Sequence, residues 1–357
     1  MNSEFKMQYR NLGSTGLKVS VFGLGNWVTS DDPSFQERTT ELVKKACSLG
    51  INYFDTAEMY GAGNAEILLG NTLKALNIPR EDLVISTKVF FGPQGGQNAI
   101  GLSRKKIIES TNASLKRMQL DYVDIIFAHA YDYNTPVEET CRAFDYLINK
   151  GKALYWGTSN WPAQRIMEAL IVCEKKGLIK PVVEQCEYNM LSRQDVEKEL
   201  GPLFDNHGYG TTIYSPLAGG FLSGKYNDGN IPEDSRYANP WCSDSLAMDY
   251  EKYFESEKRD DFLKTLKGIA EVAKDIGCTQ AQLALAWAIA NRDVSTAILG
   301  ATKESQLEEN VKAVEIVSKI TPQVEERIRK ILNNDSEQFI NFNNLMPYPS
   351  RRSRYIK

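Results

Sequence analysis

Polar side chains close three predicted strands of this sequence, and a tyrosine follows the first of them. Asp55 ends the apolar run that begins at Ile51, and Tyr60 lies in the turn after it. Lys88 ends the run Val-Ile-Ser-Thr-Lys, and His129 ends Val-Asp-Ile-Ile-Phe-Ala-His. Alternate residues of a strand share a face, so each polar residue closes an inward-facing row. The spacing therefore predicts that the four side chains belong to one site.

These residue types suit the protonation of a carbonyl oxygen. A free tyrosine has a pKa of about 10 and is a poor acid at neutral pH, but a nearby ammonium group stabilises the phenolate. We therefore expect Lys88 to lower the pKa of Tyr60, and Asp55 to orient Lys88 and keep it charged. His129 would fix and polarise the carbonyl oxygen while a hydride reaches the carbon. The alternative is a buried Lys–Asp ion pair beside an unrelated histidine.

The composition argues against several classes of protein. The 357 residues carry a formal net charge of −4, from 42 basic and 46 acidic residues, which disfavours a nucleic-acid binder. No apolar run approaches the roughly 18 residues of a membrane-spanning helix, and the first residues show no secretory signal. The six cysteines never approach CxxC spacing, which is typical of a reducing compartment, so we expect a cytoplasmic protein without membrane insertion. With two histidines, a multi-His metal site is nearly excluded and no metal is expected.

Apolar strands alternate with helices along the chain. The predicted strands are 21–25, 51–57, 83–89, 122–129, 153–159, 182–188, 210–215 and 296–300. The helices expected between and after them include 37–48, 65–76, 103–118, a helix starting with a Thr135 cap and Pro136, 162–176, 195–206, 260–277, 280–291, 303–317 and 323–332. Eight βα units favour an α/β fold of the (β/α)8 TIM-barrel type, with active-site residues at the carboxyl ends of the strands. The alternative, a doubly wound open sheet, lacks its phosphate-binding fingerprint.

Three further segments complete the predicted organisation. An N-terminal β-hairpin (7–20) precedes the barrel, a long loop (218–258) follows the seventh strand, and a C-terminal extension follows the eighth. We expect residues 1–333 to form a single barrel domain and residues 334–357 an irregular tail.

Two glycine-containing turns could meet phosphate. Residues 219–225 match GxxxxGK, but Tyr226 replaces the Ser or Thr that a P-loop requires, so a nucleotide-hydrolysing P-loop is disfavoured while a lysine–phosphate contact is not. Gly300-Ala-Thr302 leads from the last strand into a helix, a common phosphate site in barrels. The alternative at this turn is plain helix capping by Thr302.

At these residues the sequence resembles the aldo-keto reductase superfamily, and most closely the branch that contains voltage-gated potassium-channel β subunits. The resemblance runs from residue 7 to about 317. The matching segments are Met7-Gln-Tyr-Arg-Asn-Leu-Gly, Phe54-Asp-Thr-Ala-Glu-Met-Tyr60, Ile85-Ser-Thr-Lys88, Gly101-Leu-Ser-Arg-Lys, Leu120-Asp-Tyr-Val-Asp, Tyr155-Trp-Gly-Thr-Ser159, Glu184-Gln-Cys-Glu-Tyr188, Ser215-Pro-Leu-Ala-Gly-Gly, Gly224-Lys-Tyr and Gly300-Ala-Thr.

The resemblance implies a barrel that binds NADPH or NADP+ in an extended pose without a Rossmann domain, and a catalytic tetrad of Asp55, Tyr60 as general acid, Lys88 and His129. It implies these cofactor-binding residues: Asn26, Trp27, Asp55, Ser159, Asn160, Gln185, Tyr214, Ser215, Pro216, Leu217, Ala218, Gly219, Lys225, Arg236, Gly300, Thr302, Gln306, Glu309 and Asn310. Ser159, Asn160 and Gln185 would hold the nicotinamide amide, on whose ring Tyr214 would stack. Members of the branch are often tetramers, so a homo-oligomer is expected, and a potassium-channel α subunit is a candidate partner.

Four departures from the family pattern bear on function. Mammalian channel subunits carry Asn at the position of His129, so the full tetrad favours a competent reductase. The family's Gly-Thr-Trp is Gly25-Asn26-Trp27 here, which puts the Asn26 contact in doubt, and Tyr214 stands where the family has Trp. Channel members often have Ser-Arg where this chain has Ser159-Asn160.

Two hypotheses follow from the sequence. The first is an NADPH-dependent aldo-keto reductase that reduces aldehydes or ketones to alcohols. The second is a cofactor-binding β subunit of a voltage-gated potassium channel, which acts as a redox sensor with slow turnover. A pocket formed by Trp27, Tyr60, Phe90, Phe91 and Tyr131, with the 218–258 loop, predicts an apolar or aromatic carbonyl substrate. The preference for NADPH over NADH rests on Lys225 and Arg236, because a 2′-phosphate needs positive partners.

Overall fold

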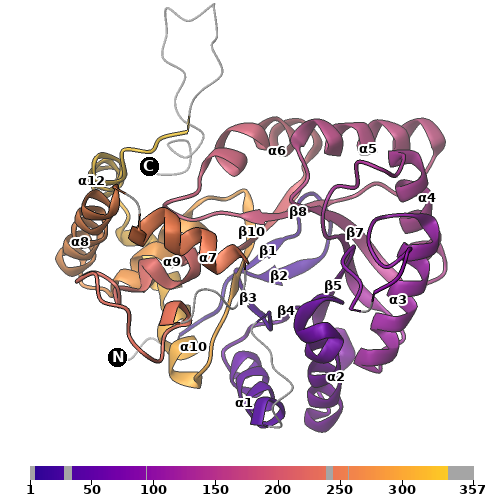
Figure 1. Ribbon diagram of the computed structural model, residues 1–357, viewed down its shortest axis with the longest axis horizontal. Coiled ribbons are helices and arrows are strands. Elements are labelled where there is room, and N and C mark those ends of the chain that lie inside the picture. Colours follow the sequence, from indigo (N-terminus) through magenta and orange to yellow (C-terminus); the bar gives the residue numbers. More distant parts are fainter. Residues whose placement is uncertain (1–4, 28–33, 94, 239–243, 256, 337–357) are drawn as a thin grey trace, which may run out of the picture. The chain divides into compact units, whose positions relative to one another are not determined.

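The computed structural model describes residues 5–27, 34–93, 95–238, 244–255 and 257–336 (Figure 1). The chain divides into two compact units. The barrel unit comprises residues 1–187, 199–214 and 293–311, and the helical unit comprises residues 188–198, 215–292 and 312–357. The single barrel domain over residues 1–333 stays a prediction, as does the irregular tail, of which residues 337–357 lie outside the described residues.

In the described part of the barrel unit, eight parallel strands form a closed barrel (Figure 1). The strands are β3 (Phe22–Gly25), β4 (Tyr53–Asp55), β5 (Val84–Val89), β6 (Val123–Ala128), β7 (Ala153–Ser159), β8 (Val183–Glu187), β9 (Gly210–Tyr214) and β10 (Val294–Leu299). Each pairs with its neighbour in sequence order, and β10 closes the barrel against β3. The predicted TIM barrel is confirmed, with strand boundaries that differ by a few residues at most.

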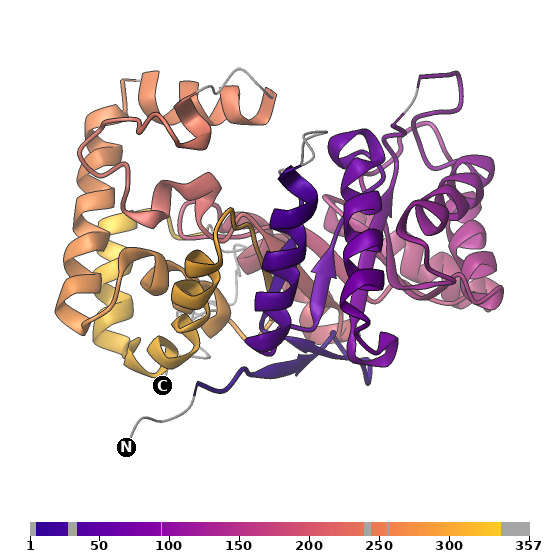
Figure 2. The same ribbon diagram turned by 90° about the horizontal axis from the view of Figure 1, so that it is seen from below.

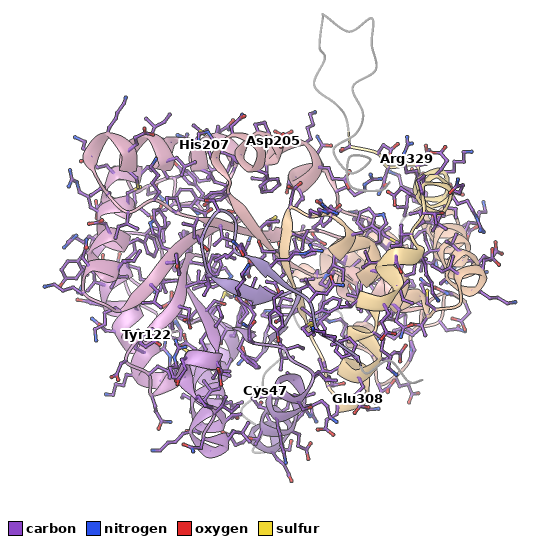
Figure 3. All side chains as sticks on the ribbon, turned by 180° about the vertical axis from the view of Figure 1, so that it is seen from behind. Cys47, Tyr122, Asp205, His207, Glu308 and Arg329 are labelled. Atoms are coloured by element: carbon purple, nitrogen blue, oxygen red, sulfur yellow. The ribbon has the colours of Figure 1, made fainter. Side chains whose placement is uncertain are left out.

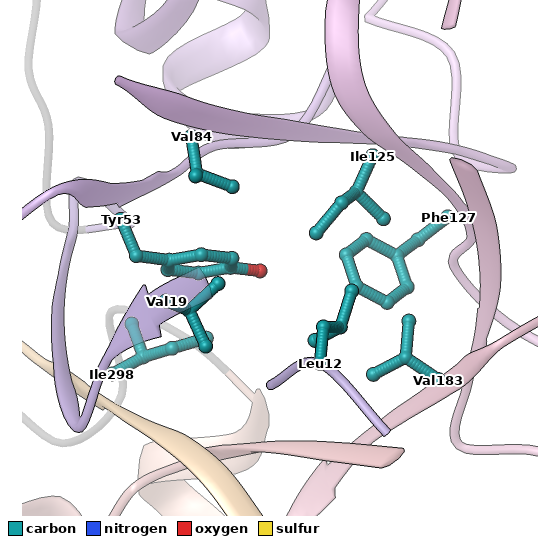
Figure 4. Packing of buried hydrophobic residues seen from close by; sticks show 8 residues of the cluster. All are labelled: Leu12, Val19, Tyr53, Val84, Ile125, Phe127, Val183 and Ile298. Carbon is teal, nitrogen blue, oxygen red and sulfur yellow. The ribbon is translucent and has the colours of Figure 1, made fainter. Parts of the chain in front are cut away.

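The strands are buried on both faces, as expected when helices cover a parallel barrel. Every residue of β5 and β6 is buried. The first residues of three strands, Tyr53, Val84 and Val183, pack inside the barrel in an apolar cluster (Figure 4). The predicted N-terminal hairpin is also confirmed. Its strands β1 (Tyr9–Asn11) and β2 (Lys18–Ser20) are antiparallel.

The hairpin contributes to the interior of the barrel. Leu12 and Val19 are fully buried in the same cluster as the first residues of the strands (Figure 4). The hairpin therefore closes the amino-terminal end of the barrel with apolar side chains, and the carboxyl end is left for polar groups.

Helices of the barrel unit follow the strands. They are α1 (Ser34–Ser48), α2 (Asn64–Leu76), α3 (Arg104–Met118), α4 (Val137–Asn149), α5 (Ala163–Lys176), α6 (Gly201–His207) and α10 (Glu304–Val311). Consecutive helices from α1 to α5 pack side by side (Figure 2). The Lys45 Nζ atom of α1 lies 2.7 Å from Glu308 of α10, and Figure 3 labels Glu308 beside Cys47 of α1. These helices hold the strands from outside.

Three predicted helices differ in detail. Thr135 does not cap α4, because the helix begins one residue later than predicted, at Val137, and Pro136 takes the cap position without a side-chain bond. The Thr135 hydroxyl donates to Asp132. The helix expected over 195–206 is a π-type turn, η3 (Asp195–Glu199), followed by α6, because Pro202 lacks an N–H and starts a new helix. The helix expected over 303–317 ends at Val311.

The helical unit contains α7 (Asp244–Tyr250), α8 (Arg259–Ile276), α9 (Gln280–Ala290), α11 (Ala313–Ile316) and α12 (Pro322–Leu332), with short turns η4 (Ala218–Ser223), η5 (Arg236–Ala238), η7 (Glu251–Glu255) and η8 (Val317–Lys319). Thr279 and Gln282 form a capping box at the start of α9, and the apolar α9 is almost wholly buried. α12 packs on α8, and α11 on α9. The segment 218–258 thus contains short helices, and its residues 239–243 and 256 lie outside the described residues. Of the helices described, none combines the length and the apolar character needed to cross a bilayer.

We predict that Gly70→Ala destabilises the fold. Alanine normally favours a helix over glycine by about 1 kcal/mol. At Gly70 of α2, however, an added Cβ would lie 2.3 Å from the Met118 carbonyl oxygen of α3, a backbone atom. We expect a net loss of about 2 kcal/mol in the free energy of unfolding, measured with urea.

Gly268→Ala in α8 is the matched control. The three atoms nearest to its Cβ would all belong to the Ile331 side chain, the closest at 3.0 Å, and a side chain can shift. A Gly70→Ala variant as stable as Gly268→Ala would contradict the close packing of α2 against α3.

Candidate active site

Three neighbouring strands bring the predicted polar residues to one rim. Asp55 is the last residue of β4, Lys88 the last but one of β5, and His129 follows the end of β6. Parallel strands of a barrel end on the same side, so these side chains share its carboxyl end. The predicted side chains are also in contact with one another, through Lys88 with Asp55 and Tyr60, and through Tyr60 with His129.

The Lys88 ammonium group lies at the centre of the site. Its Nζ atom lies 2.5 Å from Asp55 Oδ2, 2.8 Å from the Thr56 carbonyl oxygen and 3.1 Å from the Tyr60 hydroxyl. Lys88 is fully buried. Burial lowers its pKa, but Asp55 and Tyr60 outweigh burial, so the pKa lies above its ordinary value and the side chain stays charged.

The second oxygen of Asp55 is also occupied. Ser86 Oγ donates to Oδ1 at 2.7 Å, and Gln185 Nε2 donates to the same atom at 3.0 Å. The carboxylate is therefore fixed from three strands, β5, β8 and its own β4. It holds the Lys88 ammonium in one position under Tyr60.

Tyr60 begins a tight turn, η1 (Tyr60–Gly63), in which Gly61 and Ala62 have positive φ angles. Burial raises the pKa of Tyr60 above its ordinary value, and Asp55 adds to this, although Lys88 acts in the opposite direction. The expected lowering by Lys88 is thus present but is outweighed, and the expectation of a net lower pKa was wrong. The hydroxyl keeps its proton at neutral pH.

His129 packs between two aromatic rings. Its ring lies edge-on to Tyr60 and to Phe91, with centroid distances of 5.9 and 5.5 Å. Its Nδ1 atom is buried and has no hydrogen-bond partner in the described part of the chain. Burial, with a smaller effect of Lys88, lowers the pKa of His129 to about 3, so the imidazole is neutral at physiological pH.

A second polar group lies at the ends of β7, β8 and β9. The Asn160 backbone, with φ of 56°, donates to the Gln185 carbonyl oxygen at 3.1 Å. The Asn160 amide donates to Ser159 Oγ at 3.2 Å and accepts from the Tyr214 hydroxyl at 3.0 Å. Ser159, Asn160, Gln185 and Tyr214, which were all predicted, therefore lie together, and Gln185 joins them to Asp55.

The turn before α10 presents two converging N–H groups. The backbone nitrogens of Thr302 and Lys303 both donate to Gln306 Oε1, at 2.7 and 3.2 Å. The helix start is thus capped by Gln306, while the Thr302 hydroxyl donates to the same oxygen. Gly300 has open space around it, and of the other predicted residues Glu309 is exposed and Asn310 is buried.

In the helical unit, two cations flank one glycine turn. Ser215 and Ala218 have positive φ angles, and Pro216, Leu217 and Gly219 complete the turn into η4. Arg236 donates to the Gly219 carbonyl oxygen at 3.4 Å, and a Cβ at Gly220 would lie 3.8 Å from Lys225 Nζ. The predicted residues 215–219, 225 and 236 are therefore neighbours within this unit.

The predicted pocket residues lie on different loops of the barrel unit. Asn26 donates its side-chain amide to the Ala65 carbonyl oxygen, and Trp27 follows it with 41% of its surface exposed. The ring of Phe90 packs against that of Phe91 with an angle of 56° between the ring planes, and Phe91 contacts His129. Tyr131 packs edge-on against Trp161, with a centroid distance of 4.9 Å.

Sequence reasoning missed two buried carboxylates near these residues. Glu58 accepts the N–H of Phe90, directly after β5, and Asp132 accepts the N–H of Leu102, shortly before α3. Glu58 lies two residues before Tyr60, and Asp132 three residues after His129. The one signal in the sequence that could have identified Glu58 is its position between the candidate catalytic residues Asp55 and Tyr60. Among the described residues, no group of three or more His, Cys, Asp or Glu side chains could hold a metal ion.

Comparison with known proteins gives one consistent result. The profile of the Aldo/keto reductase family matches residues 21–333. A protein of Arabidopsis thaliana named "Probable voltage-gated potassium channel subunit beta" is 46% identical over 328 residues, which cover 92% of this chain and 97% of that protein. A protein of Oryza sativa subsp. japonica with the same name is 44% identical over 328 residues, with the same coverage. A Schizosaccharomyces pombe protein whose name also refers to this subunit is 48% identical over 327 residues, covering 91% of this chain and 93% of that protein.

We predict that His129→Gln makes the fold less sensitive to acid. The unfolded chain binds a proton at this histidine from about pH 6.5 downward, whereas the folded chain stays neutral there until about pH 3. Stability is therefore lost as pH falls through this window, by about 2 kcal/mol at pH 5 from this group alone. The free energy of unfolding, measured with urea, should decrease between pH 7.5 and pH 5.0 by about 2 kcal/mol less in the variant than in the wild type.

The control is His207→Gln, which alters an exposed histidine at the end of α6 (Figure 3). This variant should keep the acid sensitivity of the wild type. Equal sensitivity in all three proteins would show that His129 is not buried as a neutral group.

Proposed function

Since this chain belongs to the aldo/keto reductase family, we propose that it is an NADPH-dependent oxidoreductase that reduces aldehydes or ketones to alcohols. One observation carries the proposal. The buried Lys88 ammonium contacts both the Asp55 carboxylate and the Tyr60 hydroxyl, and a neutral His129 ring lies beside Tyr60. A structural ion pair requires neither the phenol nor the histidine.

The residues at the ends of β7–β9 fit a nicotinamide group. Its amide needs donors and acceptors together, which Ser159, Asn160 and Gln185 supply, and the Tyr214 ring offers a flat apolar face. When bound, the cofactor supplies a hydride to the carbonyl carbon. The hydrogen bond from Gln185 to Asp55 would fix the position of the nicotinamide group relative to the proposed acid, Tyr60.

Two places fit the phosphates of the cofactor. The N–H groups of Thr302 and Lys303 already converge on one acceptor, the Gln306 oxygen, and an anion could take its place. In the helical unit, Lys225 and Arg236 flank the glycine turn with positive charge. These cations favour NADPH over NADH, and we assign the adenine end to Glu309 and Asn310 and the pyrophosphate to residues 215–219.

The protein contributes the proton. Tyr60 remains protonated until the carbonyl oxygen gains negative charge, then donates its proton, and Lys88 stabilises the phenolate that forms. His129 is neutral and can donate one ring N–H to the same oxygen. Asp55 prevents Lys88 from moving away as the charge on Tyr60 changes.

The aromatic residues near the rim favour an apolar or aromatic substrate. Phe90, Phe91 and Tyr131 are half-buried, and Trp27 exposes much of its ring. Such side chains bind flat apolar groups well. We therefore expect better turnover of aromatic than of short aliphatic aldehydes.

A second candidate function is that of a potassium-channel β subunit. The relatives that bear this name match this chain over more than nine-tenths of its length. In this case the protein would be a cytoplasmic tetramer that binds a channel α subunit and holds its cofactor as a redox sensor. Light scattering would give four times the 40.2 kDa chain mass, and oxidation of bound NADPH would stop near one equivalent.

We predict that Tyr60→Phe retains NADPH binding but loses at least ~10² in turnover, the usual contribution of a general acid. Single-turnover mixing with NADPH and 4-nitrobenzaldehyde, followed at the cofactor absorbance, measures the rate. Tyr122→Phe is the control and should react like the wild type, because Tyr122 lies just before β6, at the end of that strand opposite the rim. A Tyr60→Phe variant of normal rate would remove Tyr60 from the proposed role.

We also predict the pH dependence of turnover. Burial raises the pKa of Tyr60 above its ordinary value and lowers the pKa of His129 to about 3, so neither group changes protonation between pH 5 and 9. The single-turnover rate should be flat in this range and should fall only at alkaline pH, when Tyr60 loses the proton that it must donate. A loss of rate with a midpoint between pH 6 and 8 would contradict the assignment.

A further inference from the structure

Next to the rim, the backbone of residues 90–92, which include Phe90 and Phe91, pairs with that of residues 99–101. The Gly101 nitrogen donates to the Phe90 carbonyl oxygen at 3.0 Å, and the Gly92 nitrogen to that of Ala99 at 2.8 Å. Phe91 and Ile100 form an antiparallel bridge between these bonds. We call residues 90–92 and 99–101 the paired segment. Through Phe91 it touches His129, so its position decides where the aromatic wall of the site stands.

Glu58 ties the first strand of the paired segment. Its carboxylate is 1% exposed and accepts the Phe90 N–H at 2.8 Å. Lys106 of α3 neutralises it, with Nζ at 2.8 and 2.9 Å from the two carboxylate oxygens, and also donates to Ser110. The backbone nitrogen of Glu58 donates to the Lys88 carbonyl oxygen at 3.2 Å. One residue thus connects the Tyr60 turn, the end of β5 and the paired segment.

Asp132 ties the other end. Its carboxylate is 8% exposed and accepts the Leu102 N–H at 2.7 Å, directly after the paired segment. The Asn134 N–H and the Thr135 hydroxyl donate to it at 2.8 and 2.7 Å. Burial would raise the pKa of Asp132, but the hydrogen bonds from Thr135, Leu102 and Asn134 outweigh burial and lower it, so the group is ionised.

The close contact with Asp132 also explains why residue 101 is a glycine. Gly101 has φ of 110°, and a Cβ there would lie 2.7 Å from Asp132 Oδ2. The paired segment approaches the carboxylate so closely that a larger residue would displace it.

Both ties come from loops that carry candidate catalytic residues. Glu58 lies between Asp55 and Tyr60, and Asp132 follows His129 by three residues. We propose that Glu58, with Lys106, and Asp132 are positioning residues that fix Phe90 and Phe91 against His129 and thereby set the affinity for aromatic carbonyl substrates. The proposal rests on the reductase function proposed above and extends it to the choice of substrate.

A purely structural role is the competing explanation, and the chain offers a matched control for it. Asp124 is also a buried carboxylate, accepts a β5 backbone N–H, that of Ile85, at 2.8 Å, and pairs with a cation, Arg80, at 2.6 Å. It is the second residue of β6, and the Ile85 N–H that it accepts lies near the amino-terminal end of β5, away from the rim. Loss of Asp124 therefore tests the effect of breaking such a tie on stability alone.

The experiment compares Glu58→Gln/Lys106→Met, Asp132→Asn and the control Asp124→Asn/Arg80→Met. The paired replacements avoid leaving a buried charge without its partner. For each variant the KM for 4-nitrobenzaldehyde is divided by the KM for propanal, which is too small to need the aromatic wall. We expect this ratio to rise about tenfold in the first two variants, which is the effect of losing a charge-assisted hydrogen bond, and to stay unchanged in the control.

A structural role would lower the active fraction and hence the apparent kcat for both aldehydes alike, with the KM ratio unchanged. An unchanged ratio in variants with native near-ultraviolet circular dichroism would overturn the proposal, and so would an equal change in the control.

A second measurement uses the unaltered protein. The amide protons of Phe90 and Leu102 should exchange with solvent at least ~10²-fold more slowly than in an unstructured peptide, because buried carboxylates accept them. Exchange at the unstructured rate would overturn the proposal even if a variant failed to fold. Absence of any aldehyde turnover in the wild type would instead refute the proposed reductase function, and slow exchange at both amides would still support the ties themselves.

Discussion

Burial of the Lys88 ammonium group is the constraint on which the rim of the barrel depends. A lone buried ammonium would lose its proton or destabilise the fold, so the fold must supply a carboxylate beside it. Asp55 does this from the neighbouring strand, and Ser86 and Gln185 satisfy its other oxygen. The strands β4, β5 and β8 are thus linked through one charge pair. The third contact of Lys88, to Tyr60, is the one that this stability argument does not require.

In the proposed mechanism, the balance of effects at Tyr60 lets the phenol keep its proton until negative charge develops nearby. Burial raises the pKa of the phenol, and Lys88 opposes this without overcoming it. The proton is therefore secure while no negative charge develops nearby. In the proposed mechanism Lys88 acts mainly after the proton has left, since its ammonium group then faces the phenolate. A low pKa at rest would weaken this arrangement, because part of the tyrosine would already be deprotonated.

Much of this geometry could be predicted from the sequence because strand ends of a parallel barrel share one side. Asp55, Lys88 and His129 follow from that rule. The net pKa of Tyr60 could not be predicted, because burial depends on residues brought in by tertiary packing. Glu58 was missed for the same reason: its partner Lys106 lies 48 residues away, and nothing local distinguishes the pair from solvated charges. Thr135 was misassigned as the cap because the helix begins at Val137, which places Pro136 at the cap position.

Glu58 and Asp132 connect the loops of the rim to one another. The Tyr60 turn, the end of β5, the paired segment and the loop after β6 are joined in series, by Glu58 on one side and Asp132 on the other. Because each tie is a hydrogen bond to a buried ionised or ion-paired group, breaking one leaves an unsatisfied polar group rather than a harmless gap. Movement of Phe90 and Phe91 is therefore resisted by the loops that carry Tyr60 and His129. In the proposed function, the same bonds would therefore set both the shape of the substrate pocket and the alignment of Tyr60 as proton donor, so a substitution that changes substrate preference here should also disturb proton transfer.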